Sequence, residues 1–160
     1  MESRNDENRQ EISELLIEFK STREQLRVAK VEYGNRFREL VARLLLQTRT
    51  WRSLHIYKRR LAIEISSLQR QCNEMFEEFV KLETLRNEKQ QDYTRHLSET
   101  PESDGIARAG ILRNLNEFNR QELSEGLSLR WELLDRIEAG VEEVEAFVQA
   151  LQRKKRRREA

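Results

Sequence analysis

Residues 40–51, LVARLLLQTRTW, place six large apolar side chains within twelve residues of a strongly charged chain. Asp, Glu, Lys and Arg make up 37% of its 160 residues, against about 25% in typical globular proteins. Apolar side chains in such a concentration need a packing partner, either inside the chain or on another molecule. The six are Leu40, Val41, Leu44, Leu45, Leu46 and Trp51.

On both sides of this stretch, apolar residues recur with the alternating spacing of three and four residues that is typical of coiled coils. Every seventh residue from Ile12 to His96 is apolar or aromatic at ten of thirteen positions, and the interleaved series from Leu16 to Tyr93 is so at eight of twelve. We assign the first series to heptad position d and the second to position a. The uninterrupted repeat predicts one helix over about residues 8–97.

The repeat stops at residues 96–105, HLSETPESDG, where Pro101 disfavours helical backbone at Thr100 and Gly105 permits positive φ. A second helix is predicted over about residues 107–152, with a slip of about one residue in its apolar pattern near Leu123. A short turn between two helices favours antiparallel pairing. Charge supports this pairing, because it places the basic segment 36–60 opposite the acidic segment 132–145.

The predicted fold is therefore all-α, with a long coiled-coil helix and a shorter helix folded back on it as an antiparallel hairpin. We expect the fold to be elongated and completed by partner helices. Residues 1–45 are predicted to form a protruding N-terminal helix for partner association. Residues 46–152 would form the hairpin, with its turn at 98–106, and residues 153–160 a basic C-terminal tail.

The apolar stretch is wider than a two-stranded seam can bury, because Val41, Leu45 and Leu46 fall outside positions a and d. We interpret residues 40–51 as a junction where a helix of another chain packs, with Trp51 as an anchor. Ordinary bundle core with some exposed leucine is the alternative interpretation.

The sequence does not indicate catalysis. His55 and His96 are far apart, and Cys72 is the only cysteine, so a thiolate metal site cannot form within the chain. Glycine-rich phosphate-binding motifs and nucleophile elbows are absent from the sequence. We predict no enzymatic activity, no cofactor and no metal. Because no uninterrupted apolar run exceeds three residues, no membrane span is predicted.

Charged residues also interrupt the coiled-coil pattern. Arg23, Lys30, Lys58 and Arg86 occupy a positions, where polar side chains lower stability but can specify register and partner. Solvated gaps in a loosely closed seam are the simpler interpretation.

The C-terminal tail carries the densest block of charge: Arg153, Lys154, Lys155, Arg156, Arg157 and Arg158. Such a run can be a nuclear-import signal, an arm that binds nucleic acid or another polyanion, or a solubilising end. The single cysteine and the polar first ten residues are typical of a reducing compartment. We predict the nucleus, with the cytoplasm as the alternative.

These features together predict a structural coiled-coil subunit of a multi-protein assembly. Its partners would be other coiled-coil proteins, with a hetero-oligomer favoured over a homodimer. Together with the basic tail, these features favour the hypothesis that this assembly is nuclear or chromosomal and of the kinetochore or centromere type. The alternatives are an adaptor that binds DNA, RNA or an acidic surface, and a cytoplasmic tether or stalk.

Overall fold

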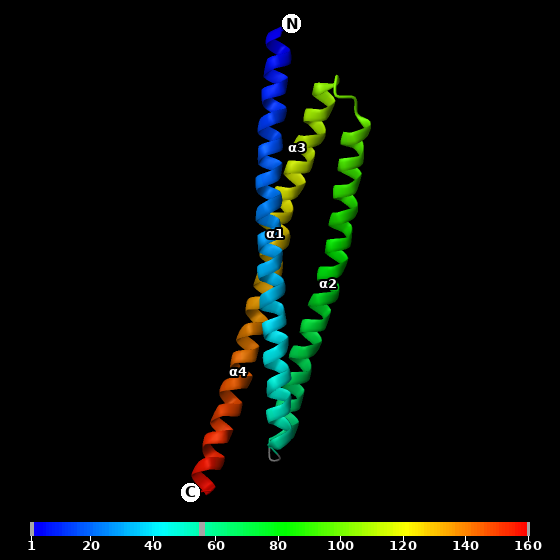
Figure 1. Cartoon of the computed structure of the whole chain (residues 1–160). Helices are drawn as coiled ribbons and strands as arrows, with labels where there is room; N and C mark the ends of the chain where they lie inside the picture. Colours follow the sequence, from blue (N-terminus) through cyan, green and yellow to red (C-terminus); the bar gives the residue numbers. More distant parts are fainter. Residues whose placement is uncertain (1, 55–56, 160) are drawn as a thin grey trace. The chain divides into compact units, whose positions relative to one another are not determined.

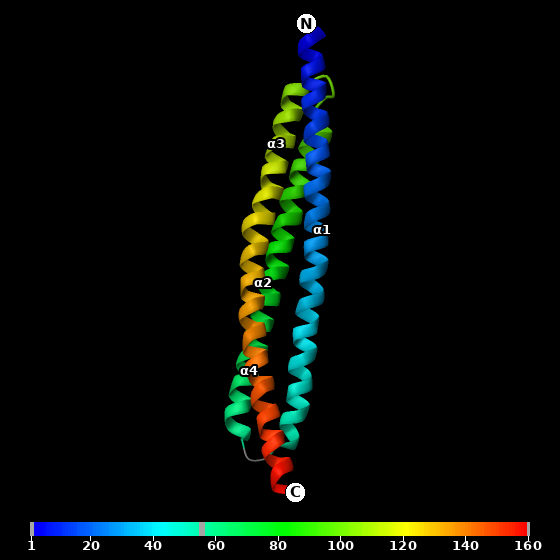
Figure 2. The same ribbon diagram turned by 90° about the vertical axis from the view of Figure 1, so that its left-hand side faces the viewer.

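The computed structural model describes residues 2–54 and 57–159, and these are helical almost throughout, which confirms the all-α class. Helix α1 spans Glu2–Ser53 and α2 spans Lys58–Glu99 (Figure 1). Helix α3 (Gly105–Gln121), the π-helical segment η1 (Glu122–Gly126) and α4 (Leu127–Glu159) then follow one another without a break (Figure 2).

The chain divides into two compact units. Unit 1 comprises Met1–Val31 and Phe79–Leu129, and unit 2 comprises Glu32–Glu78 and Arg130–Ala160. Each unit therefore contains part of α1, part of α2 and part of the third helical run.

The single helix predicted over residues 8–97 is wrong, because α1 ends at Ser53 and α2 begins at Lys58. The Trp51 indole N–H donates a hydrogen bond to the Lys58 carbonyl at 3.0 Å, and the Leu54 backbone N–H donates to the Trp51 carbonyl at 3.0 Å. The bond from Leu54 satisfies the Trp51 carbonyl, one of the carbonyls that the end of α1 leaves without an intrahelical partner, and the indole bond links the end of α1 to the start of α2. The heptad repeat continues across the break, and no proline or glycine marks it. His55 lies outside the described residues.

In unit 2 the break lets α1, α2 and α4 share one apolar core. Helices α2 and α4 are antiparallel, because Arg60 lies over the Phe147 ring and Leu68 lies against Gly140. They are closely packed, since a Cβ atom at Gly140 would lie 2.7 Å from Leu68 Cδ2. Most of the core residues occupy the predicted a and d positions or the predicted stripe of the second helix. They are Tyr33, Leu40, Leu44, Leu61, Ile65, Leu68, Cys72, Met75, Leu134, Ile137, Val141, Val144, Val148 and Leu151.

The acidic face of α4 pairs with α1 in unit 2. Arg43 makes a two-pronged contact with Glu145 at 2.8 and 2.9 Å, and Arg36 pairs with Asp135 and Glu138. Arg36 comes before Arg43 on α1, and their partners Glu138 and Glu145 follow in the same order on α4. Helix α1 therefore runs parallel to α4. Opposite charges do meet between segments 36–60 and 132–145, but the antiparallel geometry predicted for these ion pairs is wrong.

In unit 1 the N-terminal part of α1 packs along α3. Arg113 pairs with Glu11 at 2.6 Å, Arg120 pairs with Glu18, and the Asn116 side chain donates to the Leu15 carbonyl at 3.0 Å. Residues of the protruding helix predicted over 1–45 thus have intrachain partners in both units, and the prediction that they lack one is wrong. The break after Ser53 folds this segment back onto its own chain.

The third helical run is interrupted where the apolar pattern slips. The predicted slip near Leu123 lies within η1, where an added residue widens the helix and shifts the apolar face. The run begins with the Asp104 side chain accepting a hydrogen bond from the Ala107 backbone N–H at 3.2 Å, which is an ordinary N-cap. Helix α2 ends at Glu99, so the intervening turn falls within the predicted range 98–106.

Candidate interaction surfaces

The apolar stretch at residues 40–51 divides into a buried face and an exposed face. Leu40 and Leu44 are 1% exposed and belong to the core of unit 2, whereas Leu45 and Leu46 are 54% and 59% exposed. Val41 is half-buried. On an α-helix, residues four apart lie on the same face. The pairs Val41–Leu45 and Ala42–Leu46 therefore form one contiguous apolar surface on α1, which we call the leucine patch.

Trp51 is half-buried at the end of α1 and takes part in the turn to α2 through its bond to Lys58. Its polar N–H is thus already occupied by the chain's own backbone. The structure brings Leu40, Leu44 and Trp51 into intrachain contacts and leaves Leu45 and Leu46 as the accessible part of the predicted junction.

The basic tail forms the last turns of α4, and Arg153, Lys154, Lys155, Arg156, Arg157 and Arg158 are all exposed. Lys154, Lys155 and Arg158 line a small cavity of about 260 Å³ in unit 2, together with Leu54 and Tyr57. The tail is therefore a concentrated cationic surface at the end of a regular helix.

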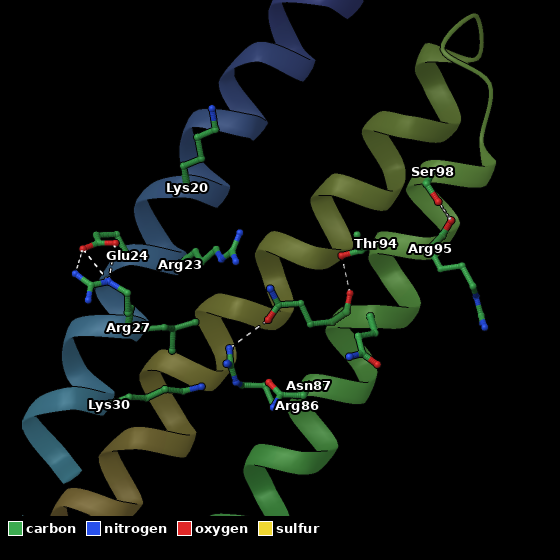
Figure 3. Close-up of a pocket in the computed structure, with 13 residues that line it drawn as sticks. Lys20, Arg23, Glu24, Arg27, Lys30, Arg86, Asn87, Thr94, Arg95 and Ser98 are labelled. Atoms are coloured by element: carbon green, nitrogen blue, oxygen red, sulfur yellow. Dashed lines mark hydrogen bonds and ion pairs between the residues drawn. The ribbon is translucent and has the colours of Figure 1, made fainter.

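A much larger feature, which the sequence analysis did not identify as a site, is a groove in unit 1 between α1 and α2 (Figure 3). Its volume is about 1070 Å³. We call it the basic groove, because six of its lining residues are basic and one is acidic. The lining residues are Lys20, Arg23, Glu24, Leu26, Arg27, Lys30, Arg86, Asn87, Gln90, Gln91, Thr94, Arg95 and Ser98.

The inner end of the basic groove holds a partly buried charge cluster. Lys30 Nζ lies 2.6 Å from Glu83 Oε1, and Arg86 Nε lies 3.6 Å from the same oxygen. Burial lowers the pKa of Lys30, and the Arg86 charge lowers it further, while Glu83 opposes both effects. Glu83 therefore faces two cations, and Glu122 adds a second negative charge near Lys30.

Two titratable groups in the core of unit 2, Tyr33 and Cys72, also have altered pKa values. Burial raises the pKa of Tyr33 to about 12, although the Arg130 charge opposes the shift. Burial likewise raises the pKa of the Cys72 thiol, which reduces the thiolate available for chemistry. Within residues 2–54 and 57–159, no group of three or more His, Cys, Asp or Glu side chains is placed to hold a metal ion.

None of the helices in the described part of the chain has a segment long and apolar enough to cross a lipid bilayer. The chain matches no protein-family model, no curated protein and no solved structure. Its function must therefore be argued from its own surfaces.

A sequence signal for the basic groove exists on α1 alone. Lys20, Arg23, Arg27 and Lys30 follow one another at spacings of three, four and three residues, which places them on one helix face. The α2 side of the groove could not be anticipated, because the end of α1 at Ser53 and the start of α2 at Lys58 allow residues 86–98 to lie beside residues 20–30.

Proposed function

We propose that the protein is a non-enzymatic structural subunit that binds other helical proteins within a multi-protein assembly. The observation that carries this proposal is the leucine patch, which stays exposed although Leu40 and Leu44 of the same stretch are buried in the core of unit 2. Burying a leucine fully contributes about 1.5–3 kcal/mol, so covering the exposed halves of Leu45 and Leu46 would add about 1.5–3 kcal/mol to an association. A regular α-helix that presents such a face suits helix–helix packing.

The test compares two variants that each place carboxylates on unit 2. Leu45→Asp/Leu46→Asp disrupts the leucine patch, and Ile63→Asp alters a side chain of α2 that is 70% exposed and outside the patch. Affinity purification with cross-linking mass spectrometry from the source cells should recover helical partner proteins with the wild type and with Ile63→Asp. The double variant should lose them while circular dichroism shows unchanged helix content. Recovery of the same partners with the double variant would place the interface elsewhere.

We place this assembly in the nucleus, at a chromosomal structure of the kinetochore or centromere type. The exposed basic tail supports this placement, because six successive cations match the charge pattern of import signals. A fluorescent fusion of the full chain should enter the nucleus, and a variant with all six tail residues replaced by Gln should not. Equal nuclear entry of both fusions would remove the support for this placement.

A polyanion-binding adaptor is the second candidate, favoured by the same exposed cations of α4. Binding of duplex DNA or RNA through the tail would weaken steeply as salt rises, because each neutralised phosphate releases counterions. Packing at the leucine patch would change little with salt. A salt titration of each interaction therefore distinguishes the two candidates.

A further inference from the structure

Helix α2 is packed less closely in unit 1, where the basic groove lies, than in unit 2. From Phe79 to Glu99, α2 contributes no buried residue, whereas its other half contributes five to unit 2. In unit 1, the side chains of Thr22 and Leu26 on α1 are buried, and α3 supplies most of the remaining core. Helix α2 thus lies against α1 with a groove between them rather than an interlocked apolar seam (Figure 3).

The dimensions of the basic groove match a helical segment. On α1 it extends from Lys20 to Lys30, which is about 15 Å at the rise of an α-helix. A helix is about 10 Å across, and a groove of about 1070 Å³ along this length has room for the side chains of one of its faces. Pockets for small molecules are lined mostly by apolar and aromatic residues, whereas Leu26 is the one apolar residue among those that line this groove.

The charges of the basic groove specify an anionic occupant. Among the described residues, Lys20 and Arg23 take part in no ion pair, and Figure 3 shows Arg23 and Lys30 extending from α1 toward α2. Arg27 is paired with Glu24 on an exposed face of its own helix. Because exposed ion pairs contribute little to stability, a carboxylate of a partner can replace Glu24 at a small cost in free energy. Because the four cations of α1 are spaced by three or four residues, carboxylates with the same spacing on an adjacent helix can meet them one by one.

Nucleic acid fits the basic groove less well. None of its lining residues is aromatic, so it offers no surface on which bases can stack. Its α2 side instead presents Asn87, Gln90 and Thr94, whose side chains can form hydrogen bonds with polar groups of a peptide.

We propose that the basic groove binds an acidic α-helix of a partner protein, with carboxylates at three- and four-residue spacing facing Lys20, Arg23, Arg27 and Lys30. The bound helix completes unit 1 as a four-helix arrangement. This inference deepens the proposed function and rests on it, because it names the chemistry of one partner surface.

The test uses the full chain and a synthetic fluorescent helical peptide whose glutamates repeat at three- and four-residue spacing on one face. A peptide of the same composition with its glutamates distributed around the helix is the ligand control. Fluorescence anisotropy at low salt should show binding of the first peptide only. Lys20→Glu/Arg23→Glu should weaken it by about tenfold or more, because two attractive contacts become repulsive. Arg4→Glu/Arg9→Glu is the matched control, since it changes the charge equally at exposed sites of the same helix and unit.

Four results would overturn the inference: no binding of the patterned peptide, equal binding of both peptides, equal losses in the two charge-reversal variants, or tighter groove-dependent binding of a single-stranded oligonucleotide. The milder variant Lys20→Gln/Arg23→Gln and circular dichroism show whether any loss reflects unfolding. Partner capture that depends on the leucine patch but not on the groove would leave the proposed function standing and refute the inference. If the patterned peptide binds the groove but no helical partner is recovered from cells, the inference stands and the proposed function is refuted.

Discussion

Replacing Gly140 with alanine should reduce the free energy of unfolding, although the same change elsewhere in a helix increases it. Alanine in a helix interior is favoured over glycine by about 0.5–1 kcal/mol. At Gly140, however, the added Cβ would lie 2.7 Å from Leu68 Cδ2, and Leu68 is held in the core of unit 2. Overpacking of this kind costs about 1–3 kcal/mol. We therefore expect a net loss between about zero and 2.5 kcal/mol.

Gly34→Ala is the matched control, because Gly34 lies in α1 of the same unit. Its nearest contact would be Arg38 Nη2 at 4.0 Å, so an added Cβ meets no obstacle. Urea denaturation followed by circular dichroism should show Gly34→Ala stabilised by about 0.5–1 kcal/mol and Gly140→Ala not stabilised.

A double-mutant cycle with Leu68→Ala identifies the cause. Truncating Leu68 removes the obstructing methyl, so Gly140→Ala should become stabilising in that background, with a coupling energy of about 1–3 kcal/mol. If Gly140→Ala is as stabilising as Gly34→Ala in the wild-type background, or if the coupling energy is near zero, the close packing of α2 on α4 is refuted.

Three further predictions concern single side chains. Asn119 is 1% exposed, and neither polar atom of its amide has a hydrogen-bond partner in the described part of the chain. Asn119→Leu should therefore raise the free energy of unfolding by about 1–2 kcal/mol in urea denaturation, and a destabilised variant would mean that the amide is satisfied. Cys72 is buried with a raised thiol pKa, so mild oxidation should give little disulfide-linked dimer on a non-reducing gel, and thiol reagents should react only on unfolding. Rapid dimer formation would instead place Cys72 between chains. The hydrogen bond from Arg43 lowers the pKa of Glu145 below its ordinary value of 4.5, so this contact stabilises the fold above that pH and is lost as the pH falls through the lowered pKa. Glu145→Gln should cost about 1 kcal/mol at neutral pH and progressively less in acid, and a cost that does not vary with pH would contradict the ion pair.

The candidate surfaces could be predicted only in part. The basic tail is visible as a run of six cations, and the structure adds only that these residues are helical and exposed. The stretch at residues 40–51 is visible as apolar, and the heptad positions separate Leu44, which is at position a and buried, from Leu45, which is outside the seam and exposed. Which helices cover the buried face of α1 depends on the tertiary structure.

Local periodicity by itself determined that the chain is helical and which residues form most of the core. Leu26, Leu40, Leu61 and Leu68 were assigned to the apolar seam from their spacing and are buried, because one helix face always collects residues three and four apart. The end of α2 at Glu99 and the interruption near Leu123 also left local signals, a proline and a slip in the pattern.

Only the tertiary structure decided where the first long helix reverses, and with it the pairing of every helix. The heptad repeat continues through residues 54–57, so a continuous helix and a broken one satisfy the same local pattern. The broken form is selected by contacts between residues far apart in sequence, such as Arg43 with Glu145 and Lys30 with Glu83. The basic groove likewise lies between segments far apart in sequence, residues 20–30 and 86–98. Periodicity predicts which face of a helix is apolar. Which other helix covers that face depends on how the whole chain folds.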